Sequence, residues 1–212
     1  MSAADLAAIG LSLRVAAAAT LLALGPGIAL GWALARRRVR WPGLVDHVVM
    51  LPLVLPPVVT GYALLLVLPR TVAFTWVAAV LAAAVVGFPL LVQTARVAFE
   101  GVDPVLESAA RVDGAGPWTL FARITLPLAA RGVAAGAALH FGRALGEFGA
   151  TIVVAGSIPG RTQTLPLALY GHLNEVGGER PALALAVAAV LLSAVTLGIH
   201  ALLVRRLPMG HG

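Results

Sequence analysis

Five long apolar segments dominate this chain and leave few folds open to it. Hydrophobic residues make up 60% of the sequence and charged residues only 11%, which is typical of a multi-span membrane protein rather than a soluble domain. Each segment is long enough to cross a hydrocarbon core of about 30 Å, and inside a bilayer a helix satisfies its own backbone hydrogen bonds. We therefore predict an all-α polytopic transmembrane helix bundle, with a single domain over residues 1–212. The predicted spans are residues 9–35, 47–69, 72–99, 132–156 and 181–204.

The basic residues predict how this bundle is oriented. All 15 are arginines, and most lie at the ends of the apolar segments, notably in the loop at 36–46, in the polar segment 100–131 and at Arg205-Arg206. Because short cytoplasmic loops are enriched in basic residues, we expect a multi-pass protein with the N-terminus outside and the C-terminus in the cytoplasm. This distribution suits contact with membrane lipid, and it does not suit a nucleic-acid interface.

The second span is not expected to be a regular helix. It contains Pro52, Pro56 and Pro57, with Thr60 and Gly61 close behind. Proline removes a backbone donor and clashes with a preceding carbonyl, and in a bilayer the freed groups must face protein or a wet cavity. The sequence leaves open whether this break is a packed kink or lines a pathway.

The polar stretch at residues 103–127 is the one long interruption in the middle of the chain. We interpret it as two short helices joined by a turn, since Asp103 suits an N-cap and Asp113-Gly114 is a strong turn signal. Leu126-Pro127 is expected to end the second helix. An amphipathic element of this kind is either an ordinary surface loop or a helix that docks into the groove of a soluble partner.

Two glutamate–arginine pairs are separated by four residues, so each pair can meet on one helix face. Glu107 and Arg111 lie in the polar stretch. Arg143 and Glu147 lie in the fourth span, where a charged group costs about 2.5–3.5 kcal/mol. The second pair is therefore either a structural ion pair or part of the polar wall of a translocation route.

Hydroxyl groups on two other spans could contribute to such a route. Thr60 and Thr151 are neutral hydroxyl donors that would line such a route if their faces point inward. Farther along, the outer segment 157–180 has Thr164 and Pro166 at the start of a short helix that runs to about Asn174. That helix is either interfacial or re-entrant.

The sequence offers little catalytic chemistry. There is no GxxxxGK[ST] phosphate loop, so the chain does not bind ATP by that mechanism, and there is no cysteine. The five histidines are scattered, and His140 on its own is better suited to packing than to metal binding. We expect no cofactor, no metal site and no enzymatic activity of this chain.

The polar stretch has a distinctive order of residues, namely Glu107, Ala109 and Ala110, then Gly114, then Ile124, Leu126 and Pro127. This order resembles the EAA loop of bacterial ABC-importer permeases, although Ser108 stands where the second motif letter is usually alanine. In that family the loop forms coupling helices on a separate ATPase. The resemblance therefore implies two copies of an ATPase subunit and makes these residues, together with Asp113, the expected ATPase-coupling set.

Three further runs resemble the molybdate-type permeases of the same family. They are LPLVLPPVVTGY at 51–62, ALGEFGATI at 144–152 and IPGRTQTLP at 158–166. The resemblance implies import of molybdate, with tungstate not distinguishable from it, as well as an external molybdate-binding protein and a homodimer. Sulfate/thiosulfate permeases share the Gly-Glu-Phe-Gly core but are usually longer, and they are the alternative.

Two other classes of protein share some of these features. A self-gated ion channel would also use kinked spans and buried charges, but it would not need a docking loop between the third and fourth spans. A membrane-embedded enzyme would need a convergent set of catalytic groups. The chain offers only His140, Arg143 and Glu147 for such a set, so the permease is the favoured interpretation.

Overall fold

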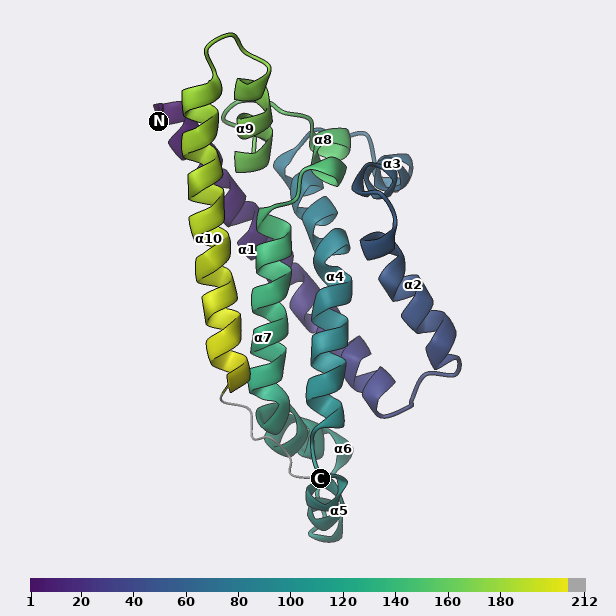
Figure 1. Cartoon of the computed structure of the whole chain (residues 1–212). Helices are drawn as coiled ribbons and strands as arrows, with labels where there is room; N and C mark the ends of the chain where they lie inside the picture. The colour runs from purple at the N-terminus through teal and green to yellow at the C-terminus, as the bar shows by residue number, and fades with distance from the viewer. Residues whose placement is uncertain (206–212) are drawn as a thin grey trace.

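The computed structural model describes residues 1–205, and these residues contain helices and no strand (Figure 1). Arg206, one of the two arginines that predict the C-terminal orientation, lies outside the described residues. The elements in chain order are α1 Ala3–Ala35, α2 Pro42–Val54, α3 Pro57–Val67, α4 Trp76–Glu100, α5 Pro104–Val112, α6 Pro117–Leu120, the π-helix η1 Phe121–Thr125, α7 Leu126–Leu145, α8 Gly149–Ala155, α9 Leu165–Leu173 and α10 Glu179–Arg205.

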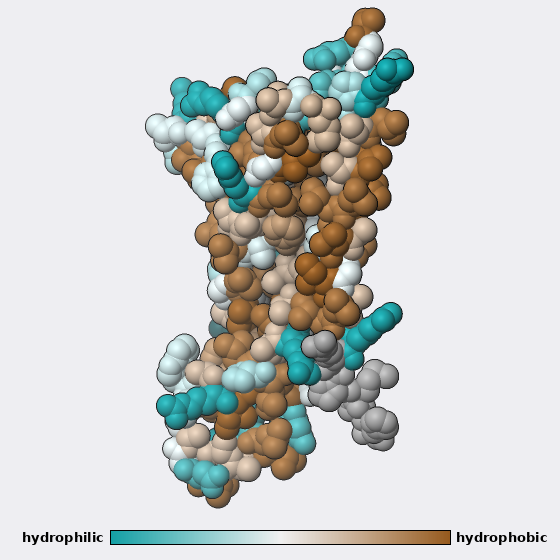
Figure 2. Space-filling view, turned by 90° about the vertical axis from the view of Figure 1, so that its left-hand side faces the viewer, coloured by the Kyte–Doolittle hydropathy of each residue, from teal (hydrophilic) through white to brown (hydrophobic). Residues whose placement is uncertain are grey.

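The described residues include four helical stretches long and apolar enough to cross a membrane. These are α1, α4, the continuous stretch Pro117–Leu145 and α10, and the bent pair α2 and α3 can supply a fifth. Apolar residues fill the middle of the molecule, while hydrophilic residues gather toward its two ends (Figure 2). The prediction of an all-α membrane bundle with about five spans is confirmed.

The helix α4 lies at the centre of this bundle. It packs against both α1 and α7, and α10 packs on the other side of α7, while α1 crosses the row diagonally (Figure 1). Glycines permit the close approach: a β-carbon on Gly31 of α1 would lie 2.9 Å from the Ala95 β-carbon, and one on Gly136 of α7 would lie 3.0 Å from the Thr94 β-carbon. Small residues at such crossings let membrane helices pack backbone to backbone.

The second span is sharply broken, in agreement with its prolines. The axes of α2 and α3 differ by 109°, and Leu55 between them is extended, with φ −66° and ψ 146°. Proline disfavours the helical conformation in the residue before it, so Pro56 places the break at this point. The second piece, α3, packs against α8. In α2, all of whose residues are described, Val49 is the only buried residue.

The fourth membrane helix begins earlier and ends earlier than residues 132–156. Helical structure is continuous from Pro117 to Leu145, so the expectation that Leu126-Pro127 ends a short helix is wrong. A proline inside an α-helix clashes with the carbonyl four residues before it. Here the π-turn Phe121–Thr125 comes directly before Pro127, and Leu126 N–H bonds to the Phe121 carbonyl, so the helix widens where the proline enters. The helix then breaks after Leu145, and α8 is a separate short helix.

The end of the bundle opposite α5 is built from α8, α9 and the first turns of α1 and α10 (Figure 1). Thr164 is the N-cap residue of α9 and Asn174 its C-cap residue, which agrees with the short helix expected there. Ser12 Oγ accepts a hydrogen bond of 2.6 Å from Leu165 N–H, and His172 Nε2 lies 2.8 Å from Asp5 Oδ1. These contacts hold α9 against α1.

Candidate functional site

The polar stretch projects from one end of the bundle as α5, a turn and the start of the fourth membrane helix (Figure 1). Asp103 caps α5, accepting a hydrogen bond of 2.8 Å from Val105 N–H. Gly114 follows the helix with φ +86° and has open space around its α-carbon. That left-handed conformation is costly for residues with a β-carbon, so this turn favours glycine for its backbone and not for lack of room.

Four large apolar side chains around this turn are exposed, and we call them the apolar patch. Val112 is 87% exposed and Trp118 is 76% exposed. Ala109 is also exposed, and Ala110 beside it is half-buried. A cluster of exposed apolar groups at the tip of a projecting loop is typical of a protein-binding surface. The patch consists of Val105, Leu106, Val112 and Trp118.

Glu107 faces away from this surface and into the protein. It is only 5% exposed. Its Oε1 lies 2.6 Å from Arg36 Nη2 and accepts a hydrogen bond of 2.8 Å from Thr125 Oγ1. Arg111, its neighbour one turn along α5, approaches only to 3.4 Å. Glu107 therefore joins α5 to the end of α1 and to the π-turn.

The charge state of Glu107 follows from these partners. Burial alone would raise the pKa of this carboxyl, but the hydrogen bonds from Arg36 and Thr125 and the positive charges of Arg36 and Arg111 outweigh burial and lower the pKa below its ordinary value. Arg36 in turn donates a hydrogen bond of 3.0 Å to the Phe99 carbonyl at the end of α4. One ionised carboxylate and one arginine thus connect four parts of the fold.

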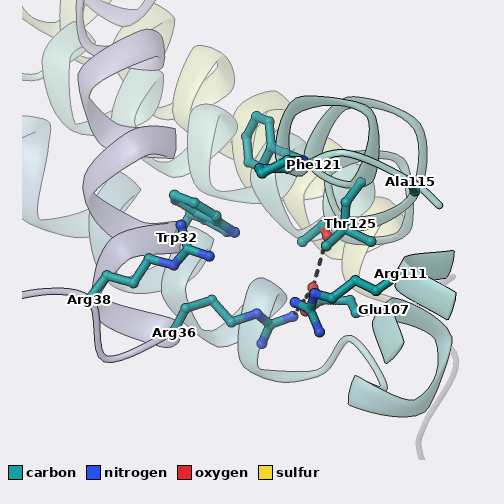
Figure 3. Close-up of a pocket in the computed structure, with 10 residues that line it drawn as sticks. Trp32, Arg36, Arg38, Glu107, Arg111, Ala115, Phe121 and Thr125 are labelled. Carbon is teal, nitrogen blue, oxygen red and sulfur yellow. Dashed lines mark hydrogen bonds and ion pairs between the residues drawn. The ribbon is translucent and has the colours of Figure 1, made fainter. Parts of the chain in front are cut away.

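A cavity of about 420 Å³ opens between the end of α1 and the polar stretch (Figure 3). Its wall includes Trp32, Arg36 and Arg38 from the α1 end, and Glu107 and Arg111 from α5. Arg38 lies with its guanidinium carbon 4.5 Å from the centre of the Trp32 ring. The cavity is therefore both aromatic and positively charged.

The structure brings together only part of the predicted coupling set. Ala109, Ala110, Asp113 and Gly114 lie on or beside the exposed surface, and Glu107 lies beneath it. Ile124, Leu126 and Pro127 instead belong to the continuous fourth membrane helix. Arg36 and Thr125 could not be predicted as partners of Glu107, because no spacing rule connects a loop arginine to a glutamate 71 residues later.

The second candidate region lies at the break between α7 and α8. Arg143 Nη1 and Glu147 Oε2 are 2.7 Å apart. The contact is an ion pair rather than a well-directed hydrogen bond, since Oε2 has no hydrogen-bond partner of good geometry among the described residues. The other oxygen, Oε1, accepts a hydrogen bond of 2.7 Å from Ala150 N–H. Glu147 is 2% exposed, and it fixes the first turn of α8.

Two predicted threonines lie on helices that meet next to this break. Thr60 belongs to α3 and Thr151 to α8, and both are buried. The two helices pack directly together, since a β-carbon on Gly61 would lie 2.7 Å from the Ala150 carbonyl oxygen. Thr60 Oγ1 is buried without a hydrogen-bond partner among the described residues. The four predicted pathway residues therefore belong to α3, to α8, or to the last turn of α7 and the turn that leads from it into α8.

His140 takes the packing position expected for it. It is fully buried in α7, with Nδ1 2.9 Å from Thr20 Oγ1 of α1 and Nε2 3.2 Å from the Ala84 carbonyl of α4. A β-carbon on Gly87 would lie 2.8 Å from the imidazole ring. The histidine therefore fills a three-helix junction in the centre of the bundle.

Comparison with known proteins identifies a matching family and several similar proteins. A family described as "binding-protein-dependent transport system inner membrane component" matches residues 27–208. The molybdenum transport system permease protein ModB of Escherichia coli (strain K12) is 46% identical over 212 aligned positions that cover 93% of each chain. ModB of Haemophilus influenzae is 42% identical, covering 96% of this chain and 95% of its own. The putative molybdenum transport system permease protein YvgM of Bacillus subtilis is 41% identical, covering 86% of each chain.

Proposed function

The chain belongs to the family of binding-protein-dependent transport system inner membrane components, and we propose that it is the membrane-spanning subunit of a bacterial ABC importer for molybdate. The observation that carries the proposal is the 46% identity to a molybdenum transport permease over 93% of both chains. Proteins of this family are multi-pass membrane subunits that work with an ATPase and a substrate-binding protein. Tungstate, a tetrahedral dianion of nearly equal size, is a second expected substrate.

The proposed arrangement puts the polar stretch in the cytoplasm and α9 outside. Arg36, Arg37, Arg38 and Arg40 follow α1 at the same end of the bundle as α5 and α6 (Figure 1), and a concentration of arginines favours the cytoplasmic side. The N-terminus is then external and the C-terminus cytoplasmic. A homodimer with two ATPase subunits is part of the proposal because the resemblance to the EAA-loop permeases implies it; the largely uncovered apolar surface of α2 is one surface on which a second copy would pack.

In the proposed mechanism, the apolar patch and the turn at Gly114 dock on the ATPase. Movement of the docked loop reaches the membrane helices through two connections. One is the chain itself, because the fourth membrane helix starts at Pro117. The other is Glu107, which binds Arg36 at the end of α1 and Thr125 in the π-turn. ATP-driven closure of the ATPase pair would thereby tilt the helices between inward-open and outward-open states.

The proposed anion route passes the crossing of α3, which carries Thr60, and α8, which carries Thr151, beside the ion pair of Arg143 and Glu147. A dianion needs positive or polar surroundings in the bilayer, yet a strong fixed site would retain it. The ion pair between Arg143 and Glu147 moderates the positive field and lowers the cost of holding an arginine at that depth. Recognition then rests mainly on the external binding protein.

The test is uptake of labelled molybdate by proteoliposomes that contain the permease, its ATPase and its binding protein. We expect ATP-dependent uptake that excess tungstate suppresses and excess sulfate does not. Equal uptake of sulfate would favour the sulfate/thiosulfate alternative. Ion flux through the permease alone, without ATPase or ATP, would instead identify a self-gated channel and overturn the proposal.

A further inference from the structure

The cavity beside the polar stretch carries more positive than negative charge. Three guanidinium groups and one carboxylate line it, which leaves a formal excess of two positive charges. This carboxylate is already paired inside the protein, because Glu107 is buried and contacts Arg36 and Thr125. Arg36 Nε is buried without a hydrogen-bond partner among the described residues. Charged groups gathered in a recess are stable when an opposite charge completes the set, so the cavity suits an anionic group.

Arg38 and Arg111 are the two arginines placed to receive that group. Arg111 keeps 52% of its side chain exposed and touches Glu107 only at 3.4 Å. Arg38 is exposed and lies with its guanidinium carbon 4.5 Å from the centre of the Trp32 ring, and it makes no ion pair with any residue of the described part of the chain. The two come from opposite walls of the cavity, one from the end of α1 and the other from α5 (Figure 3). Both guanidinium groups therefore border the same cavity.

A row of aromatic rings connects the apolar patch to this cavity. The Trp118 and Phe121 ring centres are 5.9 Å apart, and those of Phe121 and Trp32 are 5.2 Å apart. Phe121 and Trp32 line the cavity, whereas Trp118 belongs to the apolar patch. A protein that covers the apolar patch therefore meets the mouth of the cavity next. This continuity favours a side chain of that same protein over the headgroup of a lipid.

We infer that an aspartate or glutamate side chain of the ATPase subunit enters this cavity and is held by Arg38 and Arg111. The inference rests on the proposed function and extends it by naming the chemistry of the partner's contact. The glutamate of the polar stretch is neutralised inside the protein, so the permease presents positive charge at this contact. Complementary charge of this kind fixes the register of docking and speeds association.

The test compares two arginines of the same loop in permease reconstituted into nanodiscs of neutral lipid. The probe is the purified ATPase subunit that copurifies with the permease, and the measured quantities are its Kd and the dependence of Kd on salt. We expect Arg38→Gln to weaken binding about tenfold, the size expected for one hydrogen bond to a charged group, and to reduce the salt dependence. The control is Arg40→Gln, because Arg40 is exposed on the same loop, lies over Trp41 and does not line the cavity. It should leave Kd unchanged.

Three outcomes would overturn the inference. Equal weakening by Arg38→Gln and Arg40→Gln would indicate diffuse attraction, and no change with Arg38→Gln would leave the cavity without this role. An effect of Arg38→Gln that appears only in nanodiscs of anionic phospholipid would assign the cavity to a lipid headgroup. Trp118→Ala separates this inference from the proposed docking surface. If Trp118→Ala weakens binding and Arg38→Gln does not, only the carboxylate contact fails; if Trp118→Ala also has no effect, the docking surface fails.

Discussion

Glu107 and Glu147 make a useful comparison, because both are buried glutamates with an arginine four residues away. At Glu147 that local arginine is the main partner, at 2.7 Å, and the remaining contact is to Ala150 three residues later. At Glu107 the local arginine is the weakest contact, at 3.4 Å, and the strong partner is Arg36, 71 residues earlier in the chain. The same spacing thus produces a local cap in one region and a tertiary connection in the other.

The difference indicates what each glutamate can control. Glu107 connects α1, α5 and the π-turn, so its loss should be felt across the end of the bundle that carries α5. Glu147 connects the end of α7 to the first turn of α8, so its loss should be felt mainly at the crossing with α3. The four predictions below separate these roles, starting with the largest expected effect.

Glu107→Ala should lower the free energy of unfolding by about 3 kcal/mol. Removing one partner of a buried ion pair costs about 3–5 kcal/mol, and the lower end applies because Arg36 keeps its hydrogen bond to the Phe99 carbonyl. The measurement is unfolding of the purified permease in mixed detergent micelles. Glu100→Ala is the matched control, since its ion pair with Arg96 is half-exposed and such pairs contribute at most about 1 kcal/mol. Equal losses for the two variants would refute the tertiary role of Glu107.

Arg143→Ala should cost about 2 kcal/mol, because it leaves the Glu147 carboxylate buried without its cation. The loss is smaller than for Glu107→Ala, since Ala150 N–H still donates to Glu147 and Arg143 was partly exposed. Uptake of molybdate per assembled complex should fall as well, because the positive group at the α3–α8 crossing is gone. Normal uptake by the assembled variant would remove Arg143 from the proposed route.

Glu147→Gln should change stability by no more than about 1 kcal/mol, since an amide oxygen can still accept the Ala150 hydrogen bond. The charge, however, is lost, and Arg143 then acts alone on the passing dianion. We expect the rate of uptake per assembled complex to change several-fold while the amount of complex stays near normal. If uptake per assembled complex is unchanged and only assembly declines, the pair of Arg143 and Glu147 has a purely structural role. Glu107 and Glu147 then differ only in the residues that they contact.

Acid should loosen the Glu107 region by a small amount. The folded-state pKa of Glu107 lies below its ordinary value of 4.5. The stability from this carboxylate is therefore present above about pH 4.5 and is lost as pH falls through the lowered folded pKa. The protection factors of the α5 amides, which are corrected for the pH dependence of intrinsic exchange, should fall in acid in the wild type, and Glu107→Gln should show no such acid step. An identical step in Glu107→Gln would assign it to another group.

His172, at the other end of the bundle, provides a control, because its contribution to stability depends on pH in the opposite direction. Its hydrogen bond to Asp5 chiefly, and its contact with Glu175 as well, raise the pKa of this imidazole above 6.5. That stabilisation is present below pH 6.5 and is lost as pH rises through the raised pKa. The protection factors of the α9 amides should therefore fall as pH rises through that raised pKa, where those of α5 are unaffected by Glu107. Because the two pH ranges do not overlap, one pH titration measures the stability of both the α5 end and the α9 end of the bundle.

Local patterns in the sequence were enough to predict most of the helices. The spans follow from apolar length, the break at Pro56 from proline sterics, and the short helix after Thr164 from its cap and proline. The start of the fourth membrane helix was missed because Pro127 normally ends a helix. The π-turn at residues 121–125 that accommodates it involves a backbone hydrogen-bond shift with no distinctive residue type.

The candidate sites were less predictable, since they depend on contacts between distant segments. The spacing of Arg143 and Glu147 was sufficient to predict their ion pair. Arg36 was interpreted only as part of an orientation signal, although it holds the central carboxylate of the polar stretch. Which residue of an arginine cluster faces inward depends on where α1 ends relative to α5, and that is decided by the packing of the whole bundle.

The unbroken helix from Pro117 to Leu145 has a mechanical consequence. It contains 29 residues, so it is a rod of about 43 Å, with the docking loop at one end and Arg143 at the other. Turned by about 10° about the end that carries Pro117, such a rod moves its far end by about 7–8 Å. In the proposed mechanism the helix therefore acts as a lever arm, whose length from Pro117 to the break before α8 sets the size of the movement.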